Sequence, residues 1–76
     1  MDIKIYSTST CPYCIMAKKY FSSRGLTYQD LDVSKDKAAA DAMVKVSGQM
    51  GVPVILINGE IIIGFNKSRI ESIIGK

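Results

Sequence analysis

The chain has 76 residues, 47% of them hydrophobic, and a net charge of +3 from ten basic and seven acidic residues. This length predicts one small domain over residues 1–76, because a chain so short forms a single hydrophobic core. No run of about five or six like charges is present, which argues against a nucleic-acid-binding arm. The apolar runs are far shorter than the roughly 20 residues that span a bilayer, and the amino terminus lacks the apolar core of a signal peptide. We therefore expect a soluble, cytoplasmic protein with no membrane partner.

The first part of the chain predicts a strand, a polar loop and a helix. Residues 3–6 alternate between apolar and polar side chains, as a half-buried strand does. Ser7 to Thr10 form the loop, and Pro12 suits the first helical position because the N–H that it lacks has no partner there. The side chains expected on the buried face of this helix are Cys14, Ala17 and Phe21. The helix is expected to end near Arg24-Gly25.

A second strand and a second helix are expected next. Leu26 to Val33 has the composition of a strand. Its expected packing residues are Tyr28 and Leu31. Ser34 is the expected cap of the following helix, Asp36 lies in its first turn, and the helix should end near Gly48. The apolar stripe of this helix comprises Ala39, Ala42, Met43 and Val46.

The last third predicts a β-hairpin and a short helix. Residues 54–57 and 60–63 flank Asn58-Gly59, the pair that best tolerates the positive φ angles of a type I′ turn. Both strands are almost continuously apolar, which predicts helices on both faces of the sheet. Asn66 can cap the last helix, which should stop before Gly75. Its apolar face comprises Ile70, Ile73 and Ile74.

These elements predict an α/β domain in the order βαβαββα. A right-handed crossover through the first helix makes the first two strands parallel, and the hairpin adds two antiparallel strands to the same sheet. The expected architecture is a three-layer α/β/α sandwich around a four-stranded mixed sheet.

The motif Cys11-Pro12-Tyr13-Cys14 contains the only two cysteines of the chain and points to thiol–disulfide exchange. A helix N-terminus favours a thiolate, so we assign Cys11 as the nucleophile and Cys14, one turn inside, as the resolving thiol. The chain has no histidine that could serve as a base. We interpret Lys18 and Lys19 as lying too far along the helix to activate the site.

Three other interpretations of the cysteines remain open. Two cysteines supply half of a structural zinc site, which needs four ligands, and the chain has no further Cys or His, so we expect no bound metal. The cysteines could also be apolar fillers in an idle interaction domain. An iron–sulfur cluster shared by two chains, with Cys11 from each, would make the protein a cluster-binding dimer.

The Cys-Pro-Tyr-Cys motif, Val52-Pro53 before the hairpin and Gly64-Phe65 before the last helix together resemble the glutaredoxin family of the thioredoxin fold. The resemblance covers essentially the whole chain. It implies a dithiol oxidoreductase that reduces protein or glutathione mixed disulfides, with Pro12 and Tyr13 supporting the two cysteines. It also implies that Pro53 is cis and that Val52 offers its backbone to the bound thiol, as in strand addition.

The sequence departs from glutathione-using glutaredoxins at Thr8, at Gly51 and at residues 63–67. Family members often carry a basic residue, a threonine and a Gly-Gly pair followed by two aspartates at these places. Lys67 cannot pair with the α-amino group of glutathione as the second aspartate would, although the helix N-terminus, aided by Lys67 or Arg69, could meet its carboxylates. The residues that the resemblance implies in substrate or glutathione binding are Thr8, Val52, Pro53, Gly64, Phe65, Asn66 and Lys67.

Gly64-Phe65 before a polar helix start also resembles the NrdH-type redoxins, which thioredoxin reductase reduces. The resemblance therefore implies either glutathione, as a co-substrate, or a thioredoxin reductase-type flavoprotein as the reducing partner. We expect a monomer that acts on disulfide-containing client proteins, with no tightly bound cofactor and no nucleic-acid partner.

Overall fold

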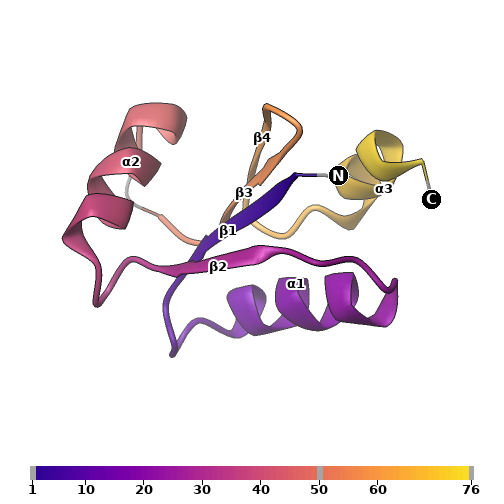
Figure 1. Cartoon of the computed structure of the whole chain (residues 1–76), viewed down its shortest axis with the longest axis horizontal. Coiled ribbons are helices and arrows are strands. Elements are labelled where there is room, and N and C mark those ends of the chain that lie inside the picture. Colours follow the sequence, from indigo (N-terminus) through magenta and orange to yellow (C-terminus); the bar gives the residue numbers. More distant parts are fainter. Residues whose placement is uncertain (1, 50, 76) are drawn as a thin grey trace.

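The secondary-structure elements follow one another in the order expected from the sequence. The computed structural model describes residues 2–49 and 51–75 (Figure 1). Its elements are β1 (Ile3–Ser7), α1 (Pro12–Ser23), β2 (Gln29–Asp32), α2 (Lys37–Ser47), β3 (Val54–Ile57), β4 (Glu60–Ile63) and α3 (Lys67–Ile74). The predicted βαβαββα order is confirmed.

The strands that the structure describes form one mixed sheet in the order β2-β1-β3-β4. β1 and β2 run parallel, while the pairs β1–β3 and β3–β4 are antiparallel. Asn58 and Gly59 have φ angles of 50° and 89°, the positive values that a tight hairpin turn of this type needs. The predicted mixed sheet and the predicted hairpin are therefore both confirmed.

Helices cover both faces of the sheet, with α1 and α3 on one face and α2 on the other (Figure 1). The α1/α3 core, as we name it, consists of Ile3, Ile5, Ala17, Phe21, Ile55, Ile57, Ile62 and Ile70. The α2 core consists of Tyr6, Ala39, Met43 and Val54. Alternate residues of one strand supply the two cores, since Ile5 faces one and Tyr6 the other. The three-layer α/β/α prediction is confirmed.

The second strand is shorter than the predicted Leu26 to Val33, and the end of α1 explains why. Leu26 N–H donates to the Phe21 carbonyl at 3.0 Å, and Gly25 N–H donates to the Ser22 carbonyl at 3.0 Å. With Gly25 at φ 71°, this is a Schellman motif, which uses the Leu26 N–H to close the helix. The chain joins the sheet only at Gln29, opposite Lys4 of β1.

The predicted Ser34 cap of the second helix is wrong, because Asp36 caps α2. Asp36 Oδ1 accepts the Ala39 N–H at 3.2 Å, and the helix begins at Lys37. Ser34 belongs to the preceding turn, where its N–H donates to Asp32 Oδ1 at 2.9 Å. Ser34 therefore lies in the turn between β2 and α2 and does not cap the helix.

The helices on the two faces of the sheet leave one face of β4 partly exposed. Ile62 is buried in the α1/α3 core, but Ile61 and Ile63 on the opposite face are 37% and 54% exposed. β4 is an edge strand, and α2 packs mainly over Tyr6 and Val54 nearer the centre of the sheet. Val46, predicted in the apolar stripe of α2, is likewise exposed.

Candidate active site

Cys11 lies where the loop after β1 enters α1. It is the N-cap residue, with φ −86° and ψ 115°, and Pro12 occupies the first helical turn as predicted. The Cys14 N–H donates to Cys11 Sγ over 3.3 Å, so sulfur takes the place of the oxygen that usually caps a helix. This donor and the positive end of the helix dipole both favour a negative charge on the sulfur. The Cys11 N–H in turn donates to the Thr8 carbonyl at 3.4 Å.

Cys14 lies in the first turn of α1 and has 0% of its surface exposed. Its pKa is raised to about 11, first by burial and then by its hydrogen bond with Cys11. A backbone hydrogen bond from Thr8 and the charge of Lys18 lower that pKa. Both cysteines are free thiols, and only Cys11 is partly exposed. The two sulfurs therefore lie in contrasting environments.

The segment before β3 contacts the first thiol. The Val52-Pro53 peptide bond is cis, which confirms the prediction for Pro53. The Cys11 thiol donates to the Val52 carbonyl oxygen over 3.9 Å. The Pro53 carbonyl accepts the Gly64 N–H at 2.8 Å, which ties the start of β3 to the residue that follows β4. The structure thus brings Val52 beside Cys11 and Gly64 beside Pro53.

The other residues predicted to bind substrate follow β4 and contact α1 further along. Phe65 packs edge-on against Tyr20, with ring centres 5.9 Å apart, and Lys67 Nζ lies 5.8 Å from the centre of the Tyr20 ring. Asn66 caps α3, as predicted, by accepting the Arg69 N–H at 3.2 Å. Tyr20 lies nine residues beyond Cys11, about 14 Å of helical rise. The roles of Phe65, Asn66 and Lys67 in substrate binding stay predictions.

Tyr13 lies two residues after the nucleophile, in the first turn of α1. Its side chain is 61% exposed, although Tyr is usually half-buried or more in a domain. Pro12 is exposed as well. The surface around Cys11 therefore offers an aromatic ring and the backbone of Val52 to an approaching molecule.

An ion pair below α1 was missed by the sequence interpretation. Lys18 Nζ lies 3.0 Å from Asp30 Oδ2, and the Ser7 hydroxyl donates to Asp30 Oδ1 at 2.7 Å. Lys18 follows Cys14 by four residues, a spacing that places two side chains on one helical face. That spacing could have linked Lys18 to Cys14 from the sequence alone. The ion pair with Asp30 could not be predicted in this way, because it depends on where β2 lies relative to α1.

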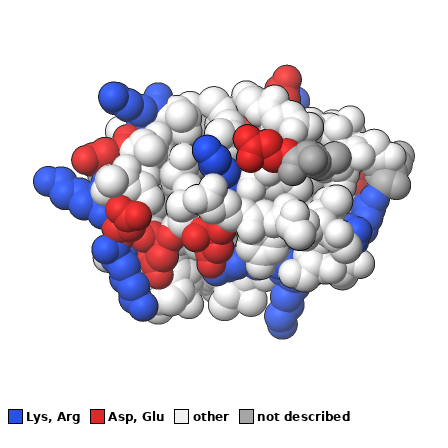
Figure 2. All heavy atoms as spheres, in the orientation of Figure 1, with Lys and Arg blue, Asp and Glu red and all other residues white. Residues whose placement is uncertain are grey.

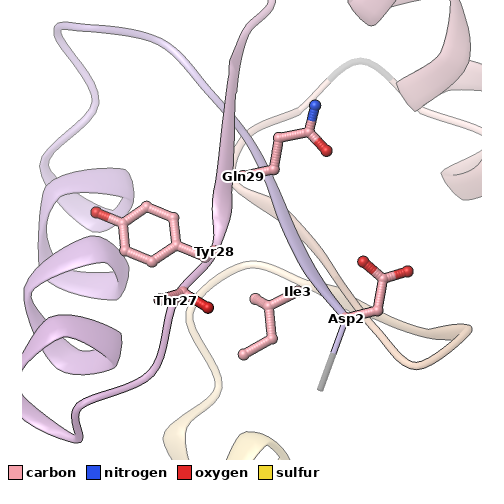
Figure 3. Close-up of a pocket in the computed structure, with 5 residues that line it drawn as sticks. All are labelled: Asp2, Ile3, Thr27, Tyr28 and Gln29. Carbon is pink, nitrogen blue, oxygen red and sulfur yellow. The ribbon is translucent and has the colours of Figure 1, made fainter.

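A hollow of about 310 Å³ lies at the other end of the sheet from the thiols, at the beginning of β1 (Figure 3). Its lining residues are Asp2, Ile3, Thr27, Tyr28 and Gln29. Figure 3 shows Tyr28 and Gln29 pointing to opposite sides of the chain, so the lining side chains do not converge on one point. The hollow carries no nucleophilic thiol, and the chemistry of the chain is concentrated at the start of α1.

The surface charges do not form a field of one sign on the face that Figure 2 shows, where acidic and basic side chains are interspersed. Among residues 2–49 and 51–75, no three His, Cys, Asp or Glu side chains are grouped so that they could hold a metal ion. Within the same residues, no helix is long and apolar enough to cross a membrane.

Comparison with known proteins identifies the family. The glutaredoxin family model matches residues 3–62. The chain is 47% identical over 74 residues to an uncharacterized glutaredoxin-like 8.6 kDa protein in the rubredoxin operon of Clostridium pasteurianum, which covers 97% of this chain and 99% of that protein. It is 40% identical over 59 residues to glutaredoxin 3 of Escherichia coli, with 78% of this chain and 71% of that protein covered.

The fold also matches solved structures. The NrdH-redoxin of Escherichia coli, described as a glutaredoxin-like protein with a thioredoxin-like activity profile, aligns with a TM-score of 0.84 at 26% identity. This alignment covers 95% of the present chain and 93% of the redoxin, and it confirms the thioredoxin-like fold. On these matches, the chain belongs to the glutaredoxin family, whose function is thiol–disulfide redox chemistry.

Proposed function

We propose that this protein is a dithiol disulfide reductase in which Cys11 is the nucleophile and Cys14 the resolving thiol. The observation that carries the proposal is the contrast between the two sulfurs. Cys11 Sγ is partly exposed and receives the Cys14 N–H at 3.3 Å, whereas Cys14 is fully buried. Only an accessible sulfur can attack an external disulfide, and the buried one can reach only its neighbour.

The reaction has two exchanges. The Cys11 thiolate attacks a disulfide R–S–S–R′, forms the Cys11–S–S–R bond and releases R′–S⁻, which takes up a proton. Cys14 then loses its proton and attacks Cys11 Sγ, which forms the Cys11–Cys14 disulfide and releases R–S⁻. The substrate gains two electrons and the protein loses two, so an external reductant must restore the dithiol.

The segment 52–53 provides the docking edge for the substrate in this proposal. The Val52 carbonyl lies 3.9 Å from Cys11 Sγ, within reach of a peptide backbone attached to the attacked sulfur. The next residue, Pro53, is tied to the end of β4 because its carbonyl accepts the Gly64 N–H at 2.8 Å. The exposed ring of Tyr13 borders the same approach.

Single-serine variants test the order of the thiols. We expect Cys11→Ser to lose disulfide reduction and to trap no client. The matched variant, Cys14→Ser, should accumulate a mixed disulfide through Cys11, which mass spectrometry detects as the mass of the attached thiol. Full activity of Cys11→Ser, or a mixed disulfide at Cys14 in that variant, contradicts the assignment.

Glutathione is the first candidate for the reductant, as a co-substrate and without a tightly bound cofactor. A thioredoxin reductase-type flavoprotein is a second candidate, favoured by the start of α3. The first turn of α3 contains no acidic residue, and Lys67 stands where an aspartate would pair with the amino group of glutathione. The similarity to the NrdH-redoxin supports the same alternative.

A paired assay separates the reductants. The oxidised protein is offered either glutathione with its reductase or thioredoxin reductase, and NADPH consumption is followed with a disulfide substrate. If the missing acid limits the use of glutathione, Lys67→Asp should increase turnover with glutathione and leave turnover with the flavoprotein unchanged. Lys37→Asp, at the first position of α2, is the control for charge alone.

A visible absorption band in protein purified without oxygen would instead favour the cluster-binding dimer.

A further inference from the structure

In the second exchange Cys14 must lose its proton. The inference about this step rests on the proposed role of Cys14 as the resolving thiol. A buried thiol must become a thiolate before it attacks, and burial opposes that charge. In the mixed disulfide Cys11 is bonded to the substrate, so it no longer holds the proton or charge that affects Cys14. The Thr8 backbone and Lys18 then remain among the groups that favour the Cys14 thiolate.

Lys18 is held in a position where its charge can act on Cys14. It lies one turn after Cys14 on α1, and its ammonium group is bound by Asp30 of β2 at 3.0 Å instead of extending into solvent. Asp30 is oriented in turn by the Ser7 hydroxyl at 2.7 Å, and Ser7 is only 1% exposed. Lys19, the next residue, is exposed. The Lys18 and Asp30 side chains are 24% and 39% exposed, so the pair lies at the edge of the interface between helix and sheet.

We propose that Lys18, anchored by Asp30 and Ser7, is a positioning residue whose charge stabilises the Cys14 thiolate during its attack on the mixed disulfide. Lys18 acts through its positive charge and transfers no proton. The Cys14 proton passes to water, the Cys11–Cys14 bond forms, the Cys11–substrate bond breaks, and the departing thiolate takes up a proton. Asp30 holds Lys18 in place and cancels part of its charge. Asp30→Asn removes the opposing charge, while the amide oxygen can still accept the hydrogen bond from Lys18.

The charged and titratable groups around Cys14 allow a prediction with a definite sign. They are Cys11 and Lys18 on its own helix and Asp30 on β2, which acts through Lys18. Lys18→Met keeps the apolar stem and removes the charge, so the Cys14 thiolate becomes harder to form. Asp30→Asn keeps a hydrogen-bonding side chain at the ion pair and removes the opposing charge, so the thiolate becomes easier to form. A purely structural role would make both variants change Cys14 in the same direction.

The expected effect is a shift in the pH profile of the resolving step. A charge near a buried thiol changes the midpoint of its titration by about half to one pH unit. The thiolate fraction at neutral pH then changes about three- to tenfold, but a more basic thiolate is a better nucleophile, so the rate changes only about two- to threefold. The midpoint of the profile is consequently a sharper readout than the rate at one pH.

The test uses two measurements on the full chain. In a Cys11→Ser background, Cys14 is the sole thiol, and the NMR shift of its Cβ carbon follows its titration without any turnover. In the background with both cysteines, the release of glutathione from a preformed Cys11–glutathione mixed disulfide is followed in a single turnover across pH. Lys18→Met, Lys18→Arg, Asp30→Asn and the control Lys19→Met are compared in both backgrounds.

We expect the midpoint to rise in Lys18→Met, to fall in Asp30→Asn, and to stay at the parent value in Lys18→Arg and Lys19→Met. The inference is overturned if Lys18→Met leaves both midpoints unchanged, if Lys19→Met shifts them equally, or if Lys18→Met and Asp30→Asn shift them in one direction. A parent protein that never releases glutathione by a Cys14-dependent step overturns the proposed function instead, and the NMR titration still reports on Lys18.

Discussion

Helices cover the two faces of the sheet to different degrees. On the face covered by α1 and α3, eight buried residues from both helices and three strands form the continuous α1/α3 core. Among residues 2–49 and 51–75, the α2 core on the opposite face has four buried residues, and Ile61 and Ile63 of β4 are left exposed beside it. One face thus has two helices over it and the other has one (Figure 1).

This difference shows how the molecule combines stability with a reactive site. Cys14 and Ala17 belong to the buried side of α1, so the larger core fixes the helix whose first turn presents Cys11. Val52, which contacts Cys11 Sγ through its carbonyl, packs instead against the α2 core. One core therefore holds α1 through Ala17, the other holds the Val52 segment, and the thiol site lies between these two segments.

The largest effect is expected from Phe21 in the α1/α3 core. Phe21 is fully buried and has aromatic neighbours in Tyr20 and Tyr28. Phe21→Ala should lower the free energy of unfolding by about 4 kcal/mol, a large part of what a domain of this size has. Met43→Ala in the α2 core should lower it by about 2–3 kcal/mol. The loss is smaller because Met is flexible and the neighbouring side chains of this smaller core can move into the space that it leaves. Urea unfolding measures both, and an equal loss would contradict the unequal roles of the two faces.

The buried thiol of Cys14 predicts a loss of stability at alkaline pH. The pKa of Cys14 is raised from its ordinary 9.0 to about 11, mainly by burial. Between these values the folded protein keeps the proton that the unfolded chain releases. Cys14 therefore stabilises the folded protein fully below pH 9.0. As the pH rises towards 11, the free energy of unfolding falls by about 2 kcal/mol.

Cys14→Ala removes this titrating group. We expect the stability difference between the parent protein and Cys14→Ala to shrink as the pH rises through that range, measured by urea unfolding at each pH. Tyr20, whose pKa is also raised by burial, titrates in both proteins and cancels in the comparison. A difference that stays constant up to pH 11 would show that Cys14 loses its proton as easily in the folded protein as in the unfolded chain.

A smaller effect tests how α2 begins on the less covered face. Asp36→Ala removes the side chain that accepts the Ala39 N–H and should cost about 1 kcal/mol. Ser34→Ala should cost only a few tenths of a kcal/mol, because Ser34 is exposed and belongs to the turn before the helix. Thermal unfolding followed by circular dichroism compares the two variants, and a larger loss for Ser34→Ala would support the cap expected from the sequence.

Local patterns in the sequence were sufficient for most of the fold. The Asn58-Gly59 turn, the Asn66 cap and the position of Pro12 each depend on a few neighbouring residues, and the structure bears out all three. The shortening of β2 could not be predicted in this way, because Leu26 closes α1 and the sheet partner of Gln29 is a distant residue. Periodicity shows that β4 is apolar but not how far α2 reaches across the sheet.

The same distinction applies to the site. The two cysteines and the Val52-Pro53 segment could be identified from motifs, since the chemistry requires those residue types. Lys18 was set aside because a helical sequence shows how far it lies from Cys11 but not which strand lies below it. Its pairing with Asp30, and through it with Ser7, depends on the parallel register of β1 and β2.

The smallest effect is expected at the exposed edge of the hairpin, where Ile62 and Ile63 are neighbours on opposite faces. Ile63 is 54% exposed, so Ile63→Thr should change the free energy of unfolding by no more than about 0.5 kcal/mol. Ile62 is buried in the α1/α3 core, so Ile62→Thr should cost about 2–3 kcal/mol through lost packing and a buried hydroxyl. Urea unfolding of both variants compares the two losses in the free energy of unfolding. Similar losses at the two positions would mean that something covers the outer face of β4 in solution, and that the two faces of the sheet are closed alike.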